Sequence, residues 1–213
     1  FSMNPAGLPY AGGQAGAFVV DAATESTAVE ISTYEQFAAF AKAVNAGTAE
    51  AYASVKLTAD ITIPAGTTWT PIGSAANPYT GVFDGDGHTV SGLTASITAA
   101  EYNTDDGIPF GLFGQTQGAT IKNLRMSNVE ISGSESSGSG ILCGRAIATT
   151  ISGCTIDNSC TFNGNTAMVG GLGCMLIEST VSDCVVAVHL QLENQAPPAG
   201  GYAYVLSNSQ IIN

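Results

Sequence analysis

The chain has 213 residues and a net charge of −12, because Lys and Arg total 5 whereas Asp and Glu total 17. With so few cations it cannot neutralise phosphates, which excludes nucleic acids and anionic membranes as expected partners. Hydrophobic residues make up 45% of the chain, which is enough for a core. The chain contains no run of about 18 consecutive apolar residues, the length that a membrane-spanning helix needs. The surface must be mostly Ser, Thr, Asn, Gln and Gly, as is common in secreted proteins.

Residues 1–20 are rich in Gly, Ala and Pro without periodicity, and we expect them to form an arm or linker that needs a partner. Within this arm, Phe18, Val19 and Val20 form the apolar part of a short candidate strand at 17–20. The N-terminus has neither a basic start nor an apolar signal core. We therefore expect a signal peptide to be absent or already removed.

Residues 21–54 are expected to contain a strand and the one clear helix. Ser32 and Glu35 fit a capping box, and Phe37, Phe40 and Val44 follow at helical spacing. Gly47 is the expected end of this helix, because glycine adopts the left-handed conformation of a C-terminal cap without strain.

From residue 55 onward the pattern changes to short β-strands. Residues 55–63 alternate apolar and polar side chains, as one half-buried strand does. Further along, Val90 and Leu93 match Ile121 and Leu124 of a later repeat, so the stretch around them is an earlier coil of the same kind.

A repeat of 30 residues begins at about residue 111, and such fixed-period self-similarity indicates a repeat architecture. No copy contains apolar residues at helical spacing over ten residues, and turn-forming residues separate its short apolar runs. This pattern favours a β-solenoid in which each copy forms one coil and like residues stack at about 4.8 Å. The apolar columns are Leu112/Leu142/Leu172, Ile121/Ile151/Val181/Ile211, Leu124/Cys154/Cys184 and Met126/Ile156/Val186.

Five cysteines cannot all pair within one chain, and none has the C-x-x-C spacing of a zinc site. Cys154 and Cys184 share a column, so their Cα atoms should lie one coil apart, within disulfide range. Buried free thiols are the favoured interpretation, because apolar residues occupy the same columns elsewhere and Cys often serves as a small core residue.

Five motifs follow the predicted helix in a fixed order. They are Leu57-Thr58-Ala59-Asp60-Ile61, Trp69-Thr70-Pro71-Ile72-Gly73, Gly81-Val82-Phe83-Asp84-Gly85-Asp86-Gly87-His88-Thr89-Val90-Ser91-Gly92-Leu93, Gly111-Leu112-Phe113-Gly114 and Ala119-Thr120-Ile121-Lys122-Asn123-Leu124. Over about residues 30–190 this series resembles the GLUG-type β-helix domains of bacterial surface proteins, found in adhesin-like proteins and beside the catalytic part of IgA-cleaving metallopeptidases. The resemblance implies a right-handed β-helix, a handedness that also follows from the general crossover rule. Later copies carry Ile141-Leu142-Cys143-Gly144 and Gly171-Leu172-Gly173-Cys174 in place of the motif that names the family.

Two acidic clusters are candidates for chemistry. Asp84, Asp86 and His88 could ligate calcium or exchange protons, but calcium loops need more oxygen ligands, and the resemblance makes this stretch a turn. The second cluster, Asp105 and Asp106, is similar to the acidic motif of β-helix pectin hydrolases, without the rest of that pattern. We therefore expect a structural turn and a solvated loop, and predict no catalytic residue, metal or cofactor.

A binding role has two sets of candidate residues. On the projecting loop at 98–108, Tyr102 with Asp105 and Asp106 could contact a surface glycan or protein. For self-assembly, the strand candidate at 17–20 could pair with the open last coil of a neighbouring copy and produce a head-to-tail polymer. The candidate contact residues on that coil are Tyr202, Tyr204 and Ile211.

Taken together, the sequence predicts an all-β, right-handed parallel β-helix at 55–213 with one N-terminal capping helix, because an open solenoid end exposes strand edges. The expected function is a non-catalytic structural or adhesive module of a secreted or cell-surface protein. A filament subunit and a carbohydrate-binding or carbohydrate-active β-helix are the alternatives. Acidic residues that converge on a cleft would favour the enzyme, and exposed aromatic side chains along one flank would favour the binding module.

Overall fold

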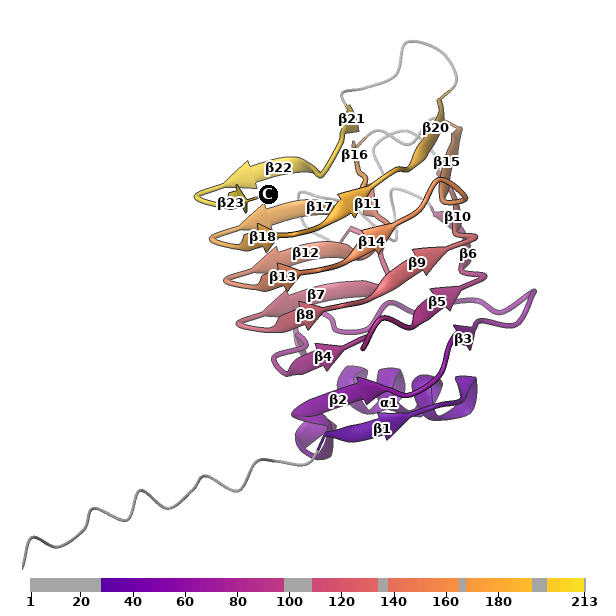
Figure 1. Ribbon diagram of the computed structural model, residues 1–213, viewed down its shortest axis with the longest axis vertical. Coiled ribbons are helices and arrows are strands. Elements are labelled where there is room, and N and C mark those ends of the chain that lie inside the picture. The colour runs from indigo at the N-terminus through magenta and orange to yellow at the C-terminus, as the bar shows by residue number, and fades with distance from the viewer. Residues whose placement is uncertain (1–27, 98–108, 134–137, 165–167, 193–198, 213) are drawn as a thin grey trace, which may run out of the picture.

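The computed structural model describes residues 28–97, 109–133, 138–164, 168–192 and 199–212. Over these ranges the chain is a parallel β-solenoid, as predicted, and every pair of neighbouring strands is parallel (Figure 1). In Figure 1 the chain runs from left to right along the front of each coil, returns from right to left along the back, and rises towards the C-terminus. The winding is therefore right-handed. No helix in the described ranges has the length and hydropathy needed to cross a membrane.

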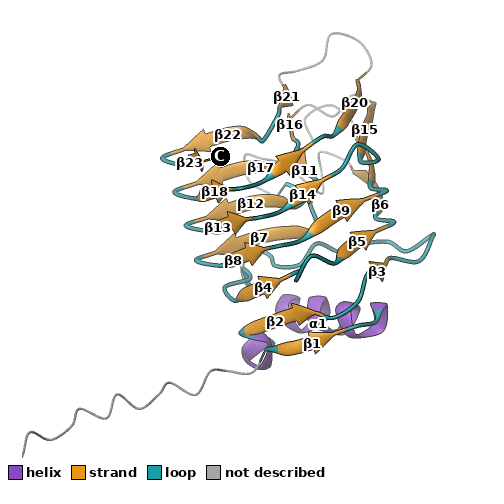
Figure 2. Cartoon of the chain, in the orientation of Figure 1, coloured by secondary structure: helices purple, strands orange, loops and turns teal. Residues whose placement is uncertain are grey.

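One sheet runs the whole height of the solenoid (Figure 2). Its seven strands are β1 (Val29–Ile31), β2 (Ser54–Leu57), β4 (Val82–Asp84), β8 (Thr120–Lys122), β13 (Thr150–Ser152), β18 (Thr180–Ser182) and β23 (Gln210–Ile212). Consecutive partners such as Ile121, Ile151 and Val181 stack directly on one another. The stacking confirms the column that the 30-residue period predicts.

Four shorter sheets hold the remaining strands of the coils. The first holds β3 (Ile61–Thr62), β5 (Thr89–Ser91), β9 (Arg125–Ser127), β14 (Thr155–Ile156) and β19 (Val185–Val186), and the second β6 (Thr94–Ile97), β10 (Glu130–Gly133), β15 (Thr161–Gly164) and β20 (His189–Leu192). The third holds β11 (Gly138–Gly140), β16 (Met168–Gly170) and β21 (Ala199–Gly200), and the fourth β7 (Phe113–Gln117), β12 (Cys143–Ile147), β17 (Gly173–Ile177) and β22 (Ala203–Ser207).

The single strand predicted at 55–63 is wrong, because the chain turns a corner there. β2 and β3 belong to different sheets and are separated by Thr58, Ala59 and Asp60. The Asp60 carboxylate accepts a hydrogen bond from the Thr89 N–H at 2.9 Å, which ties this corner to the next coil. The apolar side chains still alternate through the corner, so the pattern alone gives no sign of it.

The capping helix is α1 (Tyr34–Asn45), and it begins one residue later than the predicted box implies. Thr33, not Ser32, is the N-cap: its Oγ1 accepts from the Gln36 N–H at 3.3 Å, and Gln36 Oε1 accepts from the Thr33 N–H at 3.2 Å. The side-chain amide of Gln36 therefore serves where the carboxylate of Glu35 was expected. Gly47, with φ +71°, follows the end of the helix as predicted.

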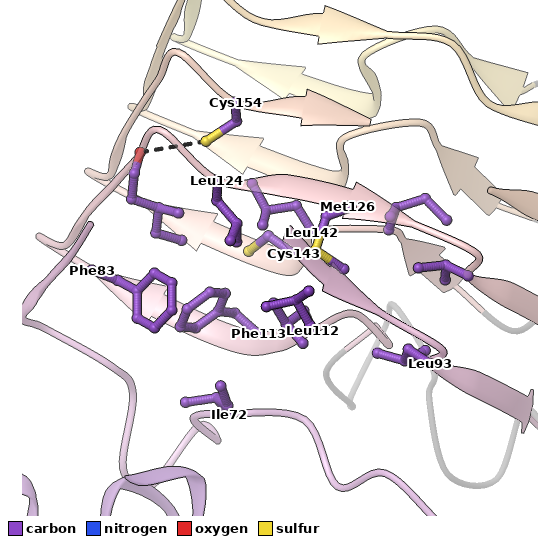
Figure 3. Close-up of a cluster of buried hydrophobic side chains, with 14 of the residues drawn as sticks. Ile72, Phe83, Leu93, Leu112, Phe113, Leu124, Met126, Leu142, Cys143 and Cys154 are labelled. Atoms are coloured by element: carbon purple, nitrogen blue, oxygen red, sulfur yellow. Dashed lines mark hydrogen bonds between the residues drawn. The ribbon is translucent and has the colours of Figure 1, made fainter. Parts of the chain in front are cut away.

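The helix lies at the N-terminal end of the solenoid, as expected (Figure 1), and its Phe37 and Phe40 side chains are buried in the core. Phe37 stacks on Trp69 with ring centroids 5.5 Å apart, and Phe40 stacks on Phe83 at 5.8 Å. Above them the interior is a column of buried apolar side chains, of which Phe83 and Phe113 form the edge-to-face pair in Figure 3.

Candidate functional site

The acidic turn between β4 and β5 holds adjacent coils together. Asp84 Oδ1 accepts hydrogen bonds from the Asp86 N–H at 2.9 Å and from Asn123 Nδ2 at 3.1 Å. Its other oxygen lies 3.1 Å from Lys122 Nζ. Burial raises the pKa of Asp84, but the hydrogen bonds from Asp86, Asn123 and Lys122 outweigh it and hold the pKa below its usual value.

Asp86 and His88, the other charged or titratable side chains of this turn, each contact a different residue and do not converge on a common point. Asp86 pairs with Lys56 at 2.9 Å, and His88 Nδ1 lies 3.3 Å from Asp60. A hydrogen bond from the Thr89 N–H lowers the pKa of Asp60. Within the described ranges, no group of three or more His, Cys, Asp or Glu side chains could hold a metal ion. Asp84 and Asp86 thus form ion pairs that join neighbouring coils.

The five cysteines are free and buried, in agreement with the favoured interpretation. The thiol of Cys154 points at the Ile121 carbonyl oxygen, 3.9 Å away on the coil below (Figure 3). Cys184 repeats the contact one coil later, with its thiol 3.9 Å from the Ile151 oxygen. Burial raises the pKa of Cys143 to about 12.

Cys154 and Cys184 interact with each other at the C-terminal end of the column. The Cys154 N–H donates to Cys184 Sγ at 3.4 Å. The thiol hydrogen bond to Cys184, followed by burial, raises the pKa of Cys154. The same hydrogen bond stabilises the Cys184 thiolate and lowers its pKa to about 7. Cys184 is therefore the cysteine with the greatest thiolate character at neutral pH.

A column of hydroxyl side chains was missed in the sequence. The Thr149 N–H donates to Ser179 Oγ at 3.1 Å, and the Ser179 N–H donates to Ser209 Oγ at 3.0 Å. The Ser179 hydroxyl in turn donates to the Ala146 carbonyl at 3.2 Å. The spacing of 30 residues between these hydroxyl residues is the signal that could have revealed the column.

The last coil, at the top of the molecule in Figure 1, carries exposed apolar residues. In the part of the chain that the structure describes, β19 to β23 are the final strands of the five sheets, with no strand stacked on them. The large side chains exposed here are Val185 (58%), Leu190 (41%), Leu206 (49%), Ile211 (37%) and Ile212 (51%). We call these five residues the open end.

The predicted assembly residues on the last coil are placed differently from one another. Ile211 lies on β23 and belongs to the open end. Tyr202 is half-buried, and its hydroxyl donates to the Cys184 carbonyl at 2.7 Å, so it fastens the last coil to the one below. Tyr204 lies within β22. The other candidates, Phe18, Val19, Val20, Tyr102, Asp105 and Asp106, lie outside the described residues.

Comparison with known proteins gives one structural likeness. No family model matches the chain, and no curated protein matches it. Among solved structures, it is similar to a protein from Bacteroides ovatus described as a "putative immunoglobulin A1 protease". The sequences are 15% identical, the TM-score is 0.44, and the match covers 88% of this chain and 76% of the other. The GLUG-type motifs therefore remain a resemblance in the sequence alone.

Proposed function

We propose that this chain is a non-catalytic structural module of a bacterial surface protein, located outside the cell, and that it joins further β-structure through the open end. The observation that carries the proposal is that, among the described residues, one coil combines strand edges without a neighbour and exposed apolar side chains. A sheet edge offers unpaired N–H and C=O groups to an incoming strand, and contiguous exposed apolar surface marks an interaction site.

The partner that fits best is a second copy of the chain, stacked head to tail. β1 and β23 are the two edges of the same seven-stranded parallel sheet, so a copy translated along the solenoid axis brings its β1 onto β23 in parallel. Val29 stands in the inward column that ends at Ile211, and Glu30 stands in the outward column that ends at Ile212. Repetition of such a contact produces an open filament.

Sedimentation velocity and negative-stain electron microscopy test this assembly. We expect oligomers or fibres that grow with added salt, because a net charge of −12 makes copies repel one another at low ionic strength. Ile212→Lys should abolish them. The matched control is Thr150→Lys, at an exposed position on an inner strand of the same sheet. Monomers at all concentrations and salt levels would contradict the proposal.

A disulfide cross-link tests the register directly. In the head-to-tail stack, Glu30 of one copy lies beside Ile212 of the next, at the spacing of about 4.8 Å between neighbouring strands, which is within disulfide range. Glu30→Cys combined with Ile212→Cys should give a ladder of covalent polymers on a non-reducing gel after mild oxidation. Each single variant should stop at dimers. A double variant that also stops at dimers would rule out this register.

A further inference from the structure

A cleft of about 340 Å³ opens where the capping helix meets the first coils, far from the open end. It lies between the C-terminal end of α1, the 3-10 helix η1 (Ala49–Tyr52) and the loop at 76–81. Its volume is at the lower end of the range of about 300–1,000 Å³ that is typical of small-molecule sites. The lining residues that matter here are Glu50, Tyr52, Asn77, Pro78, Tyr79 and Gly81.

Tyr79 places an unpaired hydroxyl against the floor of this cleft. The residue is 2% exposed, and its ring packs on Phe40 at 5.4 Å and on Phe113 at 5.6 Å. A Cβ added at Gly81 would lie 2.8 Å from the Tyr79 oxygen, so the hydroxyl lies against the backbone of this lining residue. Within the described part of the chain, this oxygen has no hydrogen-bond partner.

The unpaired hydroxyl lowers the stability of the fold relative to phenylalanine, which would fill the same space without a polar group to desolvate. Burial raises the pKa of Tyr79, so the hydroxyl stays protonated and can donate. Buried polar groups are nearly always paired, and an exception is expected where the partner arrives with a ligand. Tyr79 is therefore placed as a donor for a ligand atom in the cleft.

The remaining walls provide acceptors and apolar faces. Asn77 Nδ2 donates to the Asn45 carbonyl at 2.9 Å, which turns its Oδ1 towards Gly47, a lining residue. Glu50 adds an exposed carboxylate. Tyr52 is half-buried, with its ring 5.4 Å from Phe40, and Pro78 is also half-buried.

These groups select the chemical class of the ligand. The lining contains a carboxylate and no Lys or Arg, so it does not attract an anion. One donor and several acceptors suit hydroxyl groups, which both donate and accept, and the Tyr52 and Pro78 rings suit the C–H face of a sugar. We propose that this cleft binds a neutral hexopyranose ring, either as a free sugar or as one residue of a glycan.

The test is a titration of ¹⁵N-labelled protein with glucose, galactose, mannose and N-acetylglucosamine, followed by amide chemical shifts. At least one sugar should give saturable shifts confined to residues 47–53 and 76–81. Dextran and mannan distinguish the two sources: a glycan site binds the polymer at least as well as the monosaccharide, and a free-sugar site does not. The absence of saturable shifts with every one of these sugars and polymers would overturn the proposal.

Two variants and a control make the test specific. Tyr79→Phe should weaken sugar binding about tenfold and raise the melting temperature, a combination that a purely structural tyrosine does not give. Glu50→Gln should also weaken binding, whereas Glu35→Gln, on the first turn of α1, should not. Unchanged affinity in Tyr79→Phe, or equal binding of glycerol, would show that the cleft has no sugar site.

Discussion

Asp84 and Lys122 form an ion pair across two coils, with 3.1 Å between Oδ2 and Nζ. They stand side by side in the outward column of the long sheet, which begins with Glu30 and Lys56. The charges of these four residues alternate in sign from one coil to the next. Opposite charges on neighbouring strands stabilise a sheet, and like charges destabilise it.

The first prediction concerns the pH dependence of this pair. Because the folded-state pKa of Asp84 lies below its ordinary value of 3.8, its stabilisation is present above that value and is lost as pH falls through the folded pKa. Asp84→Asn should lower the free energy of unfolding at pH 7 by about 0.5 kcal/mol, a small amount because solvent screens this partly exposed pair. Urea denaturation at pH 7 and at a series of lower pH values measures the difference between variant and wild type, which should shrink as the pH falls through the folded-state pKa. A difference that persists in acid would show that the ion pair is not its cause.

The second prediction concerns left-handed turns that recur before the last four strands of the long sheet, β8, β13, β18 and β23. Gly118, Ala148, Glu178 and Asn208 occupy this position with φ between +46° and +65°. A left-handed residue with a Cβ costs about 1–2 kcal/mol relative to glycine. Ala148→Gly should therefore stabilise the protein by about 1 kcal/mol, and Gly118→Ala should destabilise it. Ala39→Gly, at an exposed position in α1, is the control and should destabilise, because glycine is a poor helix former. Thermal unfolding of the three variants decides the signs.

The third prediction concerns Cys184. With a pKa lowered to about 7, its thiolate should be the first to react with iodoacetamide in the folded protein. The rate should rise with pH, reach half of its maximum near the pKa and level off about one pH unit above it. By contrast, Cys143 and Cys174, whose pKa values burial raises to about 12, should react only after unfolding. Peptide mapping by mass spectrometry identifies the modified residue, and modification of Cys143 first would contradict the geometry.

The fourth prediction concerns the hydroxyl column. Ser179→Ala removes the acceptor of the Thr149 N–H, and an unsatisfied buried donor costs about 1–3 kcal/mol. Hydrogen exchange should show lost protection at the Thr149 amide in particular. Ser182→Ala, on the half-buried outward side of β18, serves as the control. Equal effects of the two substitutions would mean that the column contributes nothing beyond ordinary packing.

The columns could be predicted from the sequence because parallel strands stack in register. Ile121, Ile151 and Val181 recur at one spacing, and the structure pairs them directly. In one of the shorter sheets the spacing departs from 30 residues. Glu130 pairs with Thr161, 31 residues later, and Thr161 pairs with His189, 28 residues later. Longer or shorter turns before β15 and β20 account for the change, and turn length is not visible in an apolar pattern.

Features that depend on a single side-chain contact could not be predicted. Ser32 and Thr33 both precede a suitable partner by three residues, and only the backbone conformation decides that Thr33 is the cap. Likewise, no periodicity in the sequence indicates that the Tyr79 hydroxyl is buried against Gly81 and has no hydrogen-bond partner among the described residues. The residues proposed for assembly at 17–20 and for ligand contact at 98–108 lie outside the described ranges and stay predictions.

The stacking of coils has a mechanical consequence. The hydrogen bonds that join coils run roughly along the solenoid axis, so tension applied between the two ends loads them one row at a time instead of shearing many together. Each coil can then peel away before the next one is strained. Under such a pull we expect the molecule to lengthen in regular steps, starting from the last described coil, which has no described helix packed on it. The contacts of Phe37 and Phe40 of α1 with the first coils should be the last to break.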